Sequence, residues 1–281
     1  MNISISRFIA LWFGLLLVAF SSDLWSETRN DVLSCYQFAK IDPAFGKPSV
    51  SRELVVAIDG TFEPDKTLKE EVYYKIQRFL QAGDKVSVLQ FSAFVDSHYS
   101  QLLFSGIMEP NIEDRDDIPK KVLMVFDHCL ANQTHFVTKK ITESLISAFK
   151  PNDKQIPNTE ILTNLYNMIP ATFTRDVPHR KILLLVSDMI ENSDTTSFYS
   201  QHHIRQIEPE IELEKIKKLN LIPDLKGTEV YVIGAGWLPG SQKNFLGAKL
   251  MQPLRKFWES YFQMSSAQLK GFGQPSLFEE L

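Results

Sequence analysis

The chain has 281 residues, of which 44% are hydrophobic and 23% are charged, and its formal net charge is −4. This length is sufficient for one large domain with a sizeable core. The charge balance is mildly acidic and no basic run carries interleaved aromatic residues, which argues against a nucleic-acid partner.

The N-terminal segment has the pattern of an export signal. Arg7 precedes an apolar stretch at residues 8–20, which is short for a transmembrane span and typical of a secretory signal. Ala19 and Ser21 form a small-x-small cleavage site. We therefore expect a signal peptide at residues 1–21 and no integral membrane domain after its removal.

Two features leave the processing of this segment open. Cleavage after Ser26 is a second option, and Leu24 and Trp25 extend the apolar character enough to allow an uncleaved anchor. The mature protein is accordingly expected in the periplasm, or outside the inner membrane on an uncleaved N-terminal anchor.

Residues 22–50 are mostly polar and are expected to form a lead-in with a turn or two of helix. The only two cysteines are Cys35 in this lead-in and Cys129 in a later helical pattern. In an oxidising compartment they either pair, tying the lead-in down, or remain two buried thiols. They do not form a metal-ligand pattern.

The most informative stretch begins with an apolar run at residues 54–58. Such a run predicts a strand covered on both faces, as in a parallel sheet. Asp59 ends it abruptly, and Thr61 and Glu63 follow. Because open α/β sheets bind ligands beyond the carboxyl ends of their strands, these three oxygen-bearing side chains predict a site there.

Helical and strand patterns alternate along the rest of the chain. The expected helices are residues 68–80, 118–130, 136–149, 159–169, 208–219 and 250–264. The expected strands are residues 54–58, 85–91, 99–107, 181–186 and 228–233. The link between 85–91 and 99–107 is too short for a helix, so these strands are expected to be antiparallel, with the second at the sheet edge. The pattern predicts a doubly wound α/β fold with a mostly parallel sheet and helices on both faces.

Several local signals refine these boundaries. Thr67 and Glu70 fit a capping box at the start of the first helix, and Gly83 is expected to end it. Glu214 and Lys218 have the spacing of a helical ion pair.

This order of elements resembles the von Willebrand factor A (vWA) domain. In that family the first strand ends in Asp-x-Ser-x-Ser, and a threonine before a later helix and an aspartate after the fourth strand complete a metal ion-dependent adhesion site. Here Asp59-Gly-Thr61-Phe-Glu63 stands at the first motif, Asn158-Thr159 at the second, and Ser187-Asp188 after the fourth strand. The fifth strand, ending in Val232-Ile-Gly-Ala-Gly236, is also similar to the family.

The resemblance implies a site for Mg²⁺ or Mn²⁺, since such hard cations prefer oxygen ligands. The implied ligands are Asp59, Thr61, Glu63, Thr159 and Asp188. The carboxylate of a protein partner would complete the coordination. Glu63 departs from the family's serine because it is longer and charged, so it either binds the metal itself or points away.

The resemblance also frames the domain organisation. It implies a vWA-like domain at residues 51–264 and less chain before Thr159 than is present. Residues 108–158 are therefore expected to be a helical insertion packed on the edge or one face of the sheet. The polar, glycine-containing tail at residues 265–281 is expected to be mobile.

Three hypotheses for function follow. The first is an exported binding module that engages a protein partner in a cell-envelope assembly, and the second is a metal-free structural module. The third arises because Ile58-Asp59-Gly-Thr61 is similar to the first motif of haloacid dehalogenase-type phosphatases. Ala57 occupies the nucleophile position of that motif and cannot form an aspartyl-phosphate, so we expect no enzyme.

Overall fold

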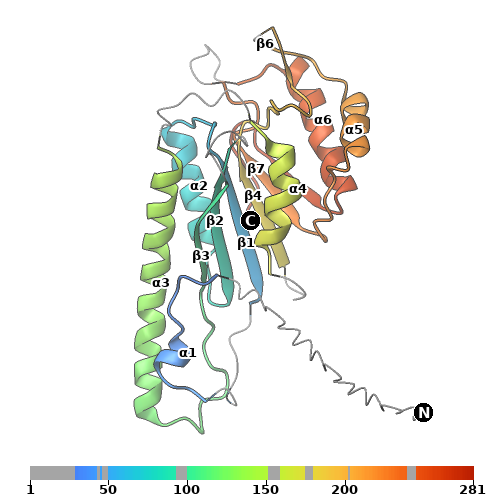
Figure 1. The fold of residues 1–281 in the computed structure, drawn as a ribbon. Coiled ribbons are helices and arrows are strands. Elements are labelled where there is room, and N and C mark those ends of the chain that lie inside the picture. Colours follow the sequence, from blue (N-terminus) through green and yellow to red (C-terminus); the bar gives the residue numbers. More distant parts are fainter. Residues whose placement is uncertain are drawn as a thin grey trace, which may run out of the picture.

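The computed structural model describes residues 29–42, 45, 50–92, 100–150, 159–174, 180–201, 203–238 and 245–281 (Figure 1). The predicted signal peptide at residues 1–21 lies outside these ranges. Within them, no helix combines the length and the apolar character that a membrane span requires.

The centre of the fold is a six-stranded sheet with the strand order β3-β2-β1-β4-β7-β8. Its strands are β1 (Arg52–Asp59), β2 (Asp84–Phe91), β3 (Gln101–Ile107), β4 (Arg180–Val186), β7 (Glu229–Ile233) and β8 (Gln268–Phe272). Every neighbouring pair is parallel except β2 and β3. The predicted mostly parallel sheet with one antiparallel edge strand is confirmed.

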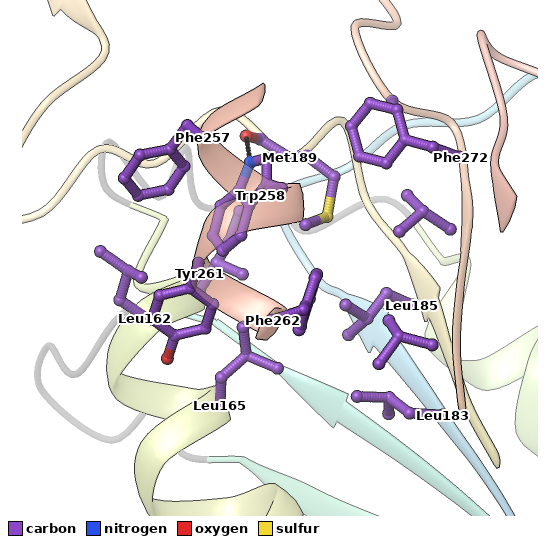
Figure 2. Packing of buried hydrophobic residues seen from close by; sticks show 14 of the residues in the cluster. Leu162, Leu165, Leu183, Leu185, Met189, Phe257, Trp258, Tyr261, Phe262 and Phe272 are labelled. Atoms are coloured by element: carbon purple, nitrogen blue, oxygen red, sulfur yellow. Dashed lines mark hydrogen bonds between the residues drawn. The ribbon is translucent and has the colours of Figure 1, made fainter. Parts of the chain in front are cut away.

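Helices cover both faces of this sheet (Figure 1). One face carries α2 (Lys66–Phe79) and α3 (Lys120–Ala148), and the other carries α4 (Ile161–Thr172), α5 (Pro209–Lys218) and α6 (Ala248–Met264). Alternate residues of each strand point to opposite faces, so β1 contributes Val56 to the first core and Val55 to the second. Figure 2 shows the second core, where Trp258 of α6 also donates a hydrogen bond to the Met189 carbonyl.

The region between β3 and α4 contains one long helix where two were predicted. Helix α3 runs through 29 residues, because no glycine or proline interrupts the chain between the patterns at 118–130 and 136–149. Its C-terminal half packs Val137 and Ile141 against the sheet. Its N-terminal half packs Phe126 against α1 (Cys35–Phe38).

The lead-in is attached to α3 and to the sheet edge. Cys35 and Cys129 form a disulfide bond, with sulfur atoms 2.05 Å apart. Asp31 lies along β3, donating its N–H to the Ser105 carbonyl at 2.7 Å and accepting the Ser105 N–H at 3.0 Å. These contacts satisfy backbone groups at the outer edge of β3, where a further strand would otherwise pair.

The prediction of a mobile C-terminal tail is wrong. Residues Gln268–Phe272 form β8, which extends the sheet beside β7. Leu277 is 4% exposed and packs in the same core as α2. The buried Lys75 of α2 donates to the Glu279 carbonyl at 2.6 Å. The chain after α6 therefore belongs to the packed domain.

Three local predictions also need correction. Asp65, and not Thr67, caps α2, because its side chain accepts the Leu68 N–H at 2.9 Å. The helix ends at Phe79, and Gly83, with φ 88°, lies in the turn before β2.

The predicted ion pair on α5 also differs. Glu214 pairs with Lys217, at 2.7 Å, and not with Lys218.

Candidate functional site

The candidate site lies where β1 and β4 end. These strands are parallel neighbours and Ile58 pairs with Val186, so the residues that follow each strand leave the sheet side by side. Asp59 is the last residue of β1, and Ser187 and Asp188 follow β4. Asp59 is fully buried and Asp188 is half-buried.

Hydrogen bonds hold both carboxylate oxygens of Asp59. Its Oδ1 accepts the Thr61 N–H at 2.9 Å and the Thr61 hydroxyl at 2.6 Å. Its Oδ2 accepts the Ser187 hydroxyl at 2.9 Å. Ser187 thus joins the loop after β4 to the carboxylate at the end of β1, and these hydrogen bonds orient the Asp59 side chain toward the site.

Thr159 reaches the same group from a third segment. Its hydroxyl oxygen is hydrogen-bonded to that of Thr61 at 2.7 Å. Thr159 does not open a helix as expected, since α4 begins at Ile161. A two-way backbone bridge with Asn192 places it, with N–H···O distances of 2.9 and 3.0 Å.

Asp188 adds the second carboxylate. Its Oδ1 accepts the Ile190 N–H at 2.8 Å, and its carbonyl accepts the Gly236 N–H at 2.8 Å. Burial and the nearby charge of Asp59 raise the pKa of Asp188 to about 8. Burial also raises the pKa of Asp59, against the opposing effect of its hydrogen bonds from Thr61 and Ser187. Two carboxyl groups thus share one poorly solvated place.

Glu63 is outside this hydrogen-bonded group. Its side chain is exposed, and its backbone carbonyl accepts the indole N–H of Trp237 at 2.9 Å. Throughout the described part of the chain, no three His, Cys, Asp or Glu side chains are grouped to hold a metal ion. The structure therefore brings together four of the predicted residues: Asp59, Thr61, Thr159 and Asp188.

Sequence reasoning did not assign roles to two residues near this group. Ser187 bonds to Asp59, and its position directly before Asp188 at a strand end was the available signal. Tyr199 lies in the short hairpin formed by β5 (Tyr199–Ser200) and β6 (His203–Ile204). Burial, followed by the charges of Asp188 and Asp59, raises its pKa to about 12. Two-residue strands leave no periodic pattern that would predict this hairpin.

The donor set suits the cation that the family resemblance implies. All the side chains brought together offer oxygen, as hydroxyls or carboxylates, which is the chemistry that Mg²⁺ prefers. Asp59 and Asp188 interact electrostatically, and a bound cation would offset the repulsion between their ionised forms. The residues present fit a divalent cation.

No protein-family model matches the chain, and no curated protein is similar to it. Many solved structures are similar in fold, among them the following three. Conserved hypothetical protein BatB from Bacteroides thetaiotaomicron is 11% identical, with 78% of this chain and 89% of that chain covered and a TM-score of 0.39. An aerotolerance-related membrane protein from Bacteroides fragilis is 12% identical, with 80% and 94% covered and a TM-score of 0.37.

The third similar structure is the VWA domain of SpRpn10. It is 9% identical, with 78% of this chain and 87% of that chain covered and a TM-score of 0.36. At such low identities and TM-scores, none of the three assigns a function to this chain.

Proposed function

We propose that this protein is an exported vWA-like module that binds a protein partner through Mg²⁺ or Mn²⁺ in a cell-envelope assembly. The observation that supports it is the convergence of Asp59, Thr61, Thr159 and Asp188 from three separate segments. A bound cation would supply a coordination position for an acidic side chain of the partner.

Each residue has a distinct part in this proposal. Asp59 and Asp188 supply the negative charge that attracts the cation. Thr61 and Thr159 add neutral hydroxyl oxygens, so the site does not gain further repulsion. Ser187 does not need to touch the cation, because its hydrogen bond to Asp59 already orients that carboxylate.

The second candidate is a metal-free structural module. Hydrogen bonds from Thr61 and Ser187 support it, because they engage both oxygens of Asp59 without a cation.

The phosphatase hypothesis has less support, because Ala57, at the nucleophile position, is fully buried in the core that faces α4 and α6. We therefore propose no enzymatic activity.

Thermal unfolding with and without Mg²⁺ or Mn²⁺ tests the proposal. A cation that binds only the folded state raises its stability by about 2.7 kcal/mol at a free concentration of 100 Kd. We expect a higher melting temperature for the wild type and no rise for Asp59→Ala. The control is Glu210→Gln, which removes an exposed carboxylate on α5 and should keep the rise.

Two outcomes would redirect the interpretation. The absence of any cation-dependent rise in the wild type would favour the metal-free module. Hydrolysis of a generic phosphate ester with Mg²⁺, lost in Asp59→Ala, would show that the protein is an enzyme.

A further inference from the structure

Glu191 is a buried acid that caps a helix from a distant part of the chain. Its side chain is fully buried, and its Oε2 accepts the Leu162 N–H in the first turn of α4 at 3.1 Å. Helix α4 has no capping side chain of its own, because its N-cap residue, Glu160, makes no such hydrogen bond. An acceptor oxygen at this position satisfies a helix N–H that has no partner within the helix.

Asn192, the residue after Glu191, also binds the segment that precedes α4. Asn192 exchanges two backbone hydrogen bonds with Thr159, at 2.9 and 3.0 Å. Adjacent residues of the loop that follows Asp188 therefore bind the chain on both sides of Glu160. This double attachment joins the segment that carries Thr159 to the loop that carries Asp188.

Thr159 depends on this attachment more than the other candidate ligands do. Asp59 ends β1 and Asp188 lies two residues beyond β4, so the sheet itself places both. Thr159 lies outside the six-stranded sheet and is placed by its bridge to Asn192. Its hydroxyl must come within 2.7 Å of Thr61 to complete the group.

We propose that Glu191 is a positioning residue that places Thr159 beside Asp59 and Asp188, and thereby sets the cation affinity without touching the cation. This inference rests on the proposed cation site. Residues behind the ligands of a metal site commonly act in this way, and their loss weakens metal binding by about 10- to 100-fold.

The chain offers a matched control at the other end of α4. Glu53 is also fully buried, and both of its oxygens accept the Thr174 N–H just beyond the helix, at 3.1 and 3.0 Å. Its Oε1 lies 2.7 Å from the Lys85 ammonium. Removing the charge of Glu53 should disturb the far end of α4 and lower stability, yet it leaves the attachment of Thr159 intact.

The first readout is calorimetric titration of Mn²⁺ into four purified proteins: wild type, Glu191→Ala, Glu191→Gln and Glu53→Gln. We expect Glu191→Ala to raise the Kd about 10- to 100-fold. Glu191→Gln should restore most of the affinity, because its amide oxygen still accepts the Leu162 N–H. Glu53→Gln should lower the melting temperature and leave the Kd unchanged.

Amide hydrogen exchange in the metal-free protein provides the second readout. Glu191→Ala should speed exchange at the amides of Thr159 and Asn192, and Glu53→Gln should not. If the wild type binds no Mn²⁺ but Glu191→Ala alone speeds exchange at Thr159 and Asn192, the proposed cation function fails. The placement of Thr159 by Glu191 is then still supported. If the wild type binds Mn²⁺ and Glu191→Ala changes neither the Kd nor the exchange, the positioning role is overturned.

Discussion

Asp59 and Asp188 control how the strand-end site responds to pH. Burial raises the pKa of both carboxyl groups, and the charge of Asp59 contributes to a value of about 8 for Asp188. Each group therefore binds a proton more readily in the folded state than in the unfolded state. The stability gained from that proton is complete below the pKa of an unfolded aspartate, near 4, and is lost as the pH rises through the folded value.

We predict that the metal-free protein loses stability between about pH 4 and pH 8, and that Asp188→Asn reduces this loss. Burial also raises the pKa of Glu191 to about 8, so part of the slope should remain in the variant. Urea unfolding in a chelator at several pH values measures the effect. The control is Asp224→Asn, which alters a carboxylate in an exposed turn and should keep the wild-type slope. If the unfolding free energy of Asp188→Asn changed with pH as much as that of the wild type, the raised pKa of Asp188 would be contradicted.

A second prediction separates Glu63 from the other candidate ligands. Because the Glu63 side chain is exposed and outside the hydrogen-bonded group, Glu63→Ser should leave Mn²⁺ affinity unchanged. Thr159→Val keeps a similar shape but removes the hydroxyl next to Thr61, so it should weaken binding. Calorimetric titration of both variants compares them. Tighter or weaker binding in Glu63→Ser would show that Glu63 acts on the site.

At the scale of elements, the lead-in depends on its covalent attachment to α3. Cys35 is fully buried in a small cluster with Tyr36 and Phe126, separate from the two cores of the sheet. Because this cluster is small, we expect the disulfide bond to contribute much of the stability of the packing of α1 against α3.

We predict that the double variant Cys35→Ser/Cys129→Ser loses unfolding free energy on the order of 4 kcal/mol. The reason is that the bond closes a loop with a sequence separation of 94 residues, which restricts the unfolded chain. Urea unfolding measures the loss. A reductant should lower the stability of the wild type and have no effect on the double variant. Equal stability of the two proteins without reductant would contradict the prediction.

The C-terminal segment offers a paired test of packing. Leu277 is 4% exposed against the sheet, whereas the next residue, Phe278, is 91% exposed. We expect Leu277→Ala to cost about 2–5 kcal/mol, because it leaves a cavity in the core. Phe278→Ala should change stability by no more than about 0.5 kcal/mol. Similar losses in both variants, measured by chemical unfolding, would show that the segment does not pack as described.

At the scale of the whole molecule, the site and the lead-in lie toward opposite ends of the sheet. The candidate ligands follow the carboxyl ends of β1 and β4, whereas Met108, just after β3, hydrogen-bonds to Asp84 where β2 begins. In Figure 1, α1 lies beside the end of α3 on that same side.

The disulfide bond also bears on localisation, because such bonds persist mainly in oxidising compartments. We predict that the exported protein begins at Ser22 or Glu27 and is recovered in the periplasmic fraction. N-terminal sequencing of that product is the measurement. Recovery of the full-length chain only in the membrane fraction would favour the uncleaved anchor.

The sequence by itself determined the elements whose signals are local. Apolar runs bounded by polar residues predicted β1, β2, β4 and β7, because a buried strand needs such a run whatever lies beside it. The resemblance of this order to the vWA domain then implied that Asp59 and Asp188 would meet, and the parallel pairing of β1 with β4 brings their strand ends to the same edge of the sheet.

Only the tertiary structure decided the features that depend on distant partners. The weakly apolar β8 is a strand because β7 offers an edge to pair with. Thr159 reaches the site through Asn192, and Glu191 caps a helix that begins thirty residues before it in the chain. Glu63 lies in the motif but outside the group. The hydrogen bonds that place these residues join segments far apart in the sequence, so no local pattern contains them.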